Sequence, residues 1–240
     1  LSSSSAASDV YKRQGYASCQ LELPEDPTRD WTSLLIYPTG PDEVKGCTLV
    51  QVEEERWLLT LAGYHNDHPS ADKDDFLAFA RALPRPEVYQ AIKGAKFLTD
   101  ISIHRFPASI RRHYGHLPTF PLGLLPVGDS NVSLNPLFGQ GMSVAIMSIR
   151  DLGHLMEGVV LTDDVQMKKL QGRFFNRLNS IFATPWDLAM GQDFRYAETK
   201  GNPPIFFKLK NLLKGLILGS SSVSVMKRFF EVVHLVQPER

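Results

Sequence analysis

The feature that most constrains this chain is a stretch near its middle, where an apolar run ends in Gly128-Asp129 and a glycine-containing loop follows. The loop carries Asn135-Pro136 and then Gly139-Gln140-Gly141, after which apolar residues keep helical spacing. We interpret the apolar run, 122–127, as a buried strand that brings the aspartate to its carboxyl end, where ligands bind in open α/β folds. The glycines would let a flat ligand approach the backbone, and the unpaired N–H groups of the helix start would stabilise negative charge on it.

Upstream of about residue 110 the sequence predicts strands at 16–23, 33–37, 47–53, 56–62 and 97–106. The first and the last alternate between apolar and polar residues, which is typical of half-buried strands. The acidic residues 53–55 join the third and fourth as a hairpin. A capped amphipathic helix is predicted over 72–83. The connections are too short for parallel crossovers, so we expect a mostly antiparallel sheet.

Helical patterns dominate after residue 162, with segments near 164–182, 204–218 and 222–237 and breaks at Pro185, Pro203 and Pro204. The predicted fold class is therefore α+β. We expect a sheet with one or two helices over 15–120, a strand–loop–helix segment over 121–157 and a helical region over 158–240. Residues 206–218 could contact a membrane surface, although a packed amphipathic helix with a solvated face explains them as well.

The first fourteen residues have a different character. Leu1–Ser8 is a serine–alanine run with no apolar side chains large enough to form a core. Asp9–Gln14 resembles the translation of the transposon end used to prepare sequencing libraries, the alternative being a natural flexible tail. We expect residues 1–14 to be disordered and artefactual, with the protein's own sequence beginning near Gly15.

Charge and cysteine content narrow the possible partners and location. The 26 basic residues balance the 26 acidic ones, which argues against a nucleic-acid partner because such proteins need a basic face. Cys19 and Cys47 are expected to be ordinary buried thiols of a reducing compartment, so we expect a cytoplasmic protein. No apolar run approaches the roughly 18 residues that a spanning helix needs.

The central stretch resembles the second flavin motif of the FAD-dependent hydroxylases related to para-hydroxybenzoate hydroxylase. The matching residues are Gly128, Asp129, Pro136, Gly139, Gln140 and Gly141. The resemblance implies that Asp129 binds the ribityl chain of FAD, and that the loop and helix start, through Met142, lie against the pyrimidine edge of the flavin ring. It also implies that 121–157 is the last strand–turn–helix of a Rossmann-like FAD domain, and that the upstream sheet is a substrate domain. The helical tail resembles the C-terminal extension of some bacterial members.

Two departures from the family pattern bear on the function. Ser130, Asn131 and Val132 follow the aspartate where many members have Ala and then Ala-x-His. No Gly-x-Gly-x-x-Gly follows a strand, so the site for the ADP half of FAD is not in this chain. We therefore expect a C-terminal fragment that is inactive and binds FAD poorly by itself.

The resemblance implies that the intact parent is an FAD-dependent oxidoreductase. We expect a monooxygenase that uses NAD(P)H and O2 on an apolar or aromatic substrate, with no acid–base residue marked in the sequence. A geranylgeranyl-type reductase or a halogenase would share the flavin turn. A different class is a non-catalytic lipid- or partner-binding module, in which Asp129 merely forms a turn.

Other residues suggest weaker hypotheses. Ser143 with Asp187 and His234 has the order of a hydrolase triad, but a nucleophile elbow needs a strand directly before the serine. Two histidine pairs have chelating spacing without a Cys or carboxylate companion, so no metal site is predicted: His65/His68 and His113/His116. A basic cluster either holds an acidic group or is solvated: Arg105, Arg111, Arg112 and His113. Four aromatic residues either line a substrate pocket or belong to the core: Trp57, Tyr64, Phe106 and Tyr114.

Overall fold

The computed structural model describes residues 7–203 together with 224, 227 and 231. The chain divides into two compact units. We call Tyr11–Ala108 with Arg195–Lys200 the sheet unit, and the remainder, chiefly Ser109–Phe194, the helix unit. The boundaries fall inside strands β1 (Ala7–Glu22) and β6 (Ser102–Arg112). The strands are hydrogen-bonded in the order β2-β3-β4-β1-β6-β7, and β5 also pairs with β1.

The sheet unit confirms the expected antiparallel arrangement. Its other strands are β2 (Ser33–Ile36), β3 (Lys45–Gln51), β4 (Trp57–Gly63) and the two-residue β5 (Lys96–Phe97). β3 and β4 form the predicted hairpin through a short 3-10 turn, η1 (Glu53–Glu55). The pairs β1–β4, β1–β5, β2–β3 and β3–β4 are all antiparallel.

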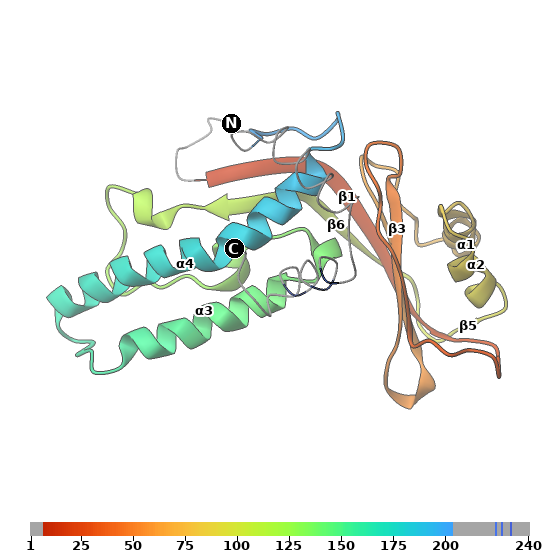
Figure 1. Ribbon diagram of the computed structural model, residues 1–240, viewed down its shortest axis with the longest axis horizontal. Helices are drawn as coiled ribbons and strands as arrows, with labels where there is room; N and C mark the ends of the chain where they lie inside the picture. Colours follow the sequence, from red (N-terminus) through yellow and green to blue (C-terminus); the bar gives the residue numbers. More distant parts are fainter. Residues whose placement is uncertain (1–6, 204–223, 225–226, 228–230, 232–240) are drawn as a thin grey trace. The chain divides into compact units, whose positions relative to one another are not determined.

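Two helices, α1 (Lys73–Arg81) and α2 (Glu87–Ile92), lie on one face of this sheet (Figure 1). α1 begins where it does because the Asp72 carboxylate accepts hydrogen bonds from the N–H groups of Asp74 and Asp75, at 2.9 and 3.0 Å. The helices and strands close a core whose centre is fully buried. It includes Leu21, Leu49, Leu59, Phe76, Val88 and Ile92.

The helix unit follows the end of β6. It comprises the 3-10 turns η2 (Tyr114–His116), η3 (Gly128–Ser130) and η4 (Pro136–Phe138), the short strand β7 (Val132–Ser133), and helices α3 (Gly141–Met156) and α4 (Asp164–Asp193). α3 and α4 lie side by side (Figure 1). The Asp163 carboxylate caps α4, and the aromatic side chains of Phe174, Phe182 and Trp186 are buried in the core of this unit.

Residues 7–14 are not disordered, which corrects the expectation for that part of the N-terminal segment. They form the first half of β1, and Val10, Lys12 and Gln14 are buried on alternate positions. The backbone of Tyr11 exchanges two hydrogen bonds with Lys200, of 2.8 and 3.0 Å. Backbone pairing therefore orders a segment that has few apolar side chains of its own. Its artefactual origin stays a prediction, and residues 1–6 lie outside the described residues.

The apolar run 122–127 does not form the strand that we expected before Asp129. Among the described residues no strand pairs with it, and the side chains of Leu122 and Leu124 are 45% and 52% exposed. Pro121 and Pro126 lack the N–H that a ladder needs, and Gly123 has a φ of +83°. The turn and the helix of the predicted strand–turn–helix are present, but an irregular segment leads into them.

Two predicted boundaries also shift. The strand expected over 97–106 divides into β5 and β6, with a turn between them. The break expected at Pro185 is absent, because α4 runs through this proline to Asp193. Pro185 is buried beside Ile181 and Trp186, so packing compensates for the lost backbone hydrogen bond.

The helices predicted near 204–218 and 222–237, with their suggested membrane contact, lie outside the described residues apart from single positions. Within the part of the chain that the structure describes, no helix combines the length and the apolar character needed to cross a membrane.

Candidate functional site

The Gly128-Asp129 turn lies against helix α3. Gly128 has a φ of +58°, a backbone conformation that favours glycine, and a Cβ added there would lie 3.4 Å from the Cβ of Ala145. Asp129 is exposed, and its Oδ2 accepts a hydrogen bond from the hydroxyl of Ser133 at 3.5 Å. The turn thus presents a carboxylate to solvent beside the first turns of α3.

Polar side chains within the turn fix its backbone. The Ser130 hydroxyl donates to the carbonyl of Val127 at 2.6 Å, and the buried Asn131 amide donates to the carbonyl of Pro126. These Asx- and Ser-type bonds are the kind that stabilise tight turns. They show that Ser130 and Asn131, which depart from the family pattern, still form a well-bonded turn.

The Pro-x-x-Gly loop is held by a buried polar pair that the sequence did not indicate. Asn135 is 1% exposed and Asp193, the last residue of α4, is 0% exposed. The Asn135 amide donates to Asp193 Oδ1 at 2.9 Å, while its Oδ1 accepts from the N–H of Leu137 at 3.0 Å. Pro136 begins η4, and Gly139, with a φ of +65°, ends it. The loop conformation therefore depends on glycine at 139 and on a partner 58 residues away.

The start of α3 is open on the side of the glycine loop. Gln140 is its buried N-cap residue and forms no side-chain capping bond to the first turn. A Cβ at Gly141 would meet no atom within 4 Å, and Met142 is 80% exposed. The side chain of the N-cap residue thus satisfies none of the first N–H groups of α3, which are the groups that bind anions at helix N-termini.

This geometry fits a flavin. A flat isoalloxazine needs backbone free of side chains, which Gly141 provides by the open space at its Cβ position. The ring carries negative charge at its pyrimidine edge when reduced, and a helix N-terminus stabilises such charge. A ribityl chain needs an exposed acceptor, which Asp129 offers. Gly128 and Asp129 lie on a turn that contacts α3, and the predicted 139–142 segment forms the loop and the first turn that begin this helix.

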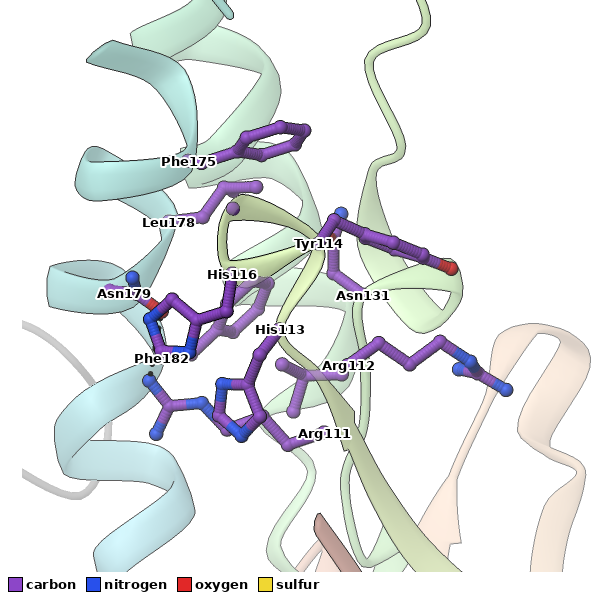
Figure 2. Close-up of a pocket in the computed structure, with 12 residues that line it drawn as sticks. Arg111, Arg112, His113, Tyr114, His116, Asn131, Phe175, Leu178, Asn179 and Phe182 are labelled. Carbon is purple, nitrogen blue, oxygen red and sulfur yellow. Dashed lines mark hydrogen bonds between the residues drawn. The ribbon is translucent and has the colours of Figure 1, made fainter. Parts of the chain in front are cut away.

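The basic cluster predicted from the sequence does not act as one group. Arg105, in the sheet unit, hydrogen-bonds His68 at 2.8 Å. Arg111 donates to Asn179 Oδ1 of α4 at 3.2 Å, and the rings of His113 and His116 stack at 5.4 Å (Figure 2). Burial, followed by the charges of Arg111 and His116, lowers the pKa of His113. Arg112 turns instead toward the Gly-Asp turn.

The remaining candidates are mostly structural. Trp57 packs edge-to-face on Trp31, and Tyr64 stacks on Tyr196, so both belong to the core of the sheet unit. Phe106 is buried with the Lys12 ammonium 5.3 Å from its ring. Tyr114 borders a small cavity between the end of β6 and α4 (Figure 2).

Neither the hydrolase nor the metal hypothesis gains support. Ser143 lies in the first turn of α3 after a loop rather than a strand, Asp187 lies on α4, and His234 is outside the described residues. Among the described residues, no three His, Cys, Asp or Glu side chains gather to hold a metal.

Comparison with known proteins identifies a curated relative of part of this chain. No family model matches the chain. Protein Rv3254 of Mycobacterium tuberculosis is 32% identical over 140 residues, which are 58% of this chain and 28% of that relative. The chain thus spans little more than a quarter of the curated relative that it matches.

Comparison with solved structures shows which proteins share the fold of this chain. The flavin-dependent brominase Bmp2 superposes with a TM-score of 0.66 at 15% identity, over 95% of this chain and 52% of its own. A variant of Klebsiella pneumoniae HpxO complexed with FAD gives a TM-score of 0.58 at 15% identity, over 95% and 56%. The chain shares the fold of about half of each of these proteins. The flavin-dependent halogenase CmlS gives a TM-score of 0.56 at 13% identity, over 95% of this chain and 40% of its own.

Proposed function

We propose that the whole protein is an FAD-dependent oxidoreductase, and that this chain supplies the part of its site that holds the flavin ring and ribityl chain. The observation that carries the proposal is the exposed Asp129 carboxylate on a turn packed against the open N-terminus of α3. The motif around Gly128-Asp129 and the fold shared with flavin-dependent enzymes support the same cofactor.

Each part of the site has a distinct role in this proposal. Asp129 accepts hydrogen bonds from ribityl hydroxyls, which orients the cofactor. Gly139, Gln140, Gly141 and Met142 line the edge of the ring, and the first N–H groups of α3 stabilise negative charge there. When bound, FAD supplies the redox chemistry, taking a hydride from NAD(P)H and reacting with O2.

The proposed reaction is monooxygenation of a small apolar or aromatic substrate. Halogenation is the second candidate, because Bmp2 and CmlS are named as a flavin-dependent brominase and a flavin-dependent halogenase. The two reactions differ in their need for a halide. Product analysis of the whole protein with and without bromide or chloride separates them, since only a halogenase makes a product whose formation requires the ion.

Titration of FAD fluorescence tests the cofactor assignment. We expect saturable binding to the wild-type chain, and about tenfold weaker binding to Asp129→Ala because one charged acceptor is lost. Asp42→Ala removes another exposed carboxylate, in the sheet unit, and serves as the matched control. Equal affinity in the wild type and Asp129→Ala would remove Asp129 from the site. No binding of FAD to the whole protein would refute the flavin proposal.

A further inference from the structure

The candidate flavin turn is held by hydrogen bonds from the last residue of strand β6, Arg112, and from Tyr114 just after it. The Arg112 guanidinium donates through Nη1 to the carbonyls of Asp129 and Ser130, at 3.2 and 3.4 Å. The Tyr114 hydroxyl donates to the same carbonyl of Ser130 at 2.9 Å. The backbone N–H of Arg112 donates to the carbonyl of Asn131 at 2.8 Å. Three consecutive carbonyls of the turn are therefore bonded to one arginine.

The end of β6 places these donors. Successive residues of a strand point to opposite faces, so Arg111 reaches Asn179 of α4 while Arg112 extends to the other side (Figure 2). Tyr114 begins the 3-10 turn η2 beyond the strand, and its hydroxyl also reaches the Gly-Asp turn. β6 pairs with β7 through Arg111 and Val132, which fixes the distance from this face to the turn. The end of β6 and the turn after it thus bring two donors to one short segment.

The guanidinium of Arg112 and the hydroxyl of Tyr114 are both suited to donating hydrogen bonds to backbone carbonyls. The guanidinium presents several N–H groups in a fixed plane and so can serve two carbonyls at once. The Tyr114 ring packs on Phe120 at a centroid distance of 5.2 Å, which restricts the position of its hydroxyl. Because the direction of the Asp129 carboxylate follows its backbone, these contacts decide where that carboxylate points.

We propose that Arg112 and Tyr114 are positioning residues that aim the Asp129 carboxylate at the ribityl chain of FAD. This inference rests on the proposed function. Neither side chain needs to touch the cofactor, and their effect on FAD affinity passes through Asp129. Removing them loosens the turn and weakens FAD binding without unfolding the chain.

The test combines FAD titration with hydrogen exchange of the backbone amides of 127–133. We expect Tyr114→Phe to weaken FAD binding about threefold and Arg112→Gln about tenfold, with faster exchange in the turn. Arg112→Lys should recover part of the affinity, because an ammonium can still donate to one carbonyl. Tyr37→Phe and Arg173→Gln, exposed residues remote from the turn in sequence, are the matched controls and should change neither quantity.

A double-mutant cycle separates positioning from general support of the fold. If Arg112 acts through Asp129, Arg112→Gln weakens FAD binding in the wild-type background and has no further effect in Asp129→Ala. An equal loss in both backgrounds would overturn the inference, and so would unchanged affinity in a wild-type chain that binds FAD. If the whole protein binds no FAD, the proposed function fails. Unchanged hydrogen exchange of residues 127–133 in the variants would by itself show that Arg112 and Tyr114 do not hold the turn, and it would overturn the inference.

Discussion

The two units of the chain use their apolar residues in opposite ways. In the sheet unit the alternating residues of β1, β3 and β4 face a core that α1 and α2 cover, and Leu21, Leu49 and Leu59 are all fully buried. In the helix unit α3 turns Val144, Ser148 and Asp151 inward, while Met142, Ile146 and Ile149 are 80%, 67% and 56% exposed. The apolar residues of the sheet unit therefore form a closed core. Helix α3 instead contacts α4 partly through polar side chains, and within the described part of the chain its apolar side chains at 142, 146 and 149 are exposed.

The polar contact of α3 has a clear physical basis. The Asp151 carboxylate pairs with Arg177 of α4 and with Arg150. The Ser148 hydroxyl donates to the carbonyl of Val144 at 2.6 Å, so it needs no partner on another helix. The difference teaches that apolar spacing locates a buried face only where other elements cover that face.

Phe76→Ala should have the largest effect on stability. Phe76 is fully buried in α1 and packs edge-to-face on Phe97, with ring centroids 6.1 Å apart. We expect a loss of about 3–5 kcal/mol in the free energy of unfolding, measured by urea denaturation. Leu35→Ala, at a 52% exposed position of β2, should cost less than about 0.5 kcal/mol. Similar costs for the two variants would show that the sheet unit lacks the closed core described above.

Val144→Ala and Ile146→Ala test the two faces of α3. Val144 is 1% exposed, so Val144→Ala should lower the free energy of unfolding by about 2 kcal/mol because contacts with the core are lost. Ile146→Ala should leave the free energy of unfolding nearly unchanged, because this residue is 67% exposed and alanine favours helix. Thermal unfolding of both variants gives the comparison. A larger loss for Ile146→Ala would mean that the apolar face of α3 is covered.

Asp151→Asn should lower the free energy of unfolding at neutral pH by only about 1 kcal/mol. The effect is small because solvent screens the ion pairs, since both arginine partners of Asp151 are more than half exposed. Although burial alone would raise it, hydrogen bonds from Arg177 and then Arg150 hold the pKa of Asp151 below its ordinary value. A lowered pKa in the folded state stabilises the fold above the ordinary value, and this contribution fades as pH falls through the acid range. The stability difference between wild type and variant should therefore shrink below about pH 4. A constant difference down to pH 3 would contradict the ion pair.

The cysteines of the sheet unit should give the smallest effect near neutral pH. Burial raises the pKa of Cys19 to about 11 and that of Cys47 to about 12. A thiol pKa raised by folding leaves stability unchanged below about pH 8.5 and lowers it as pH rises further. We expect iodoacetamide at pH 8 to modify the folded chain far more slowly than the urea-unfolded chain. Equal rates would show that the core of this unit opens readily.

Local signals were sufficient for much of the sheet unit. The β3–β4 hairpin and α1 follow from two apolar segments at hairpin spacing, the acidic turn between them and the Asp72 cap, which all act within a few residues. The start of α3 after Gly139 is predictable for the same reason. The ordered pairing of Tyr11 with Lys200 was not, because it joins residues far apart in sequence.

The candidate site was only partly accessible to sequence analysis. The glycines and Asp129 stand out because backbone conformation and charge restrict those positions. The hydrogen bonds from Arg112 to the Gly-Asp turn, and the one between Asn135 and Asp193, join residues that are distant in sequence. Polar side chains of this kind give no local sequence signal for such contacts. The apolar run 122–127 misled us, since its prolines mattered more than its hydrophobicity.

Mapping FAD onto the backbone by nuclear magnetic resonance tests the central claim most directly. In a titration of the isotope-labelled chain, we predict amide shifts concentrated at 128–130 and 139–142, with α1 and α2 unchanged. The same titration of Asp129→Ala should shift these amides only at higher FAD concentration. Shifts confined to the sheet unit, or none in the turn and the glycine loop, would contradict the assignment of the flavin site.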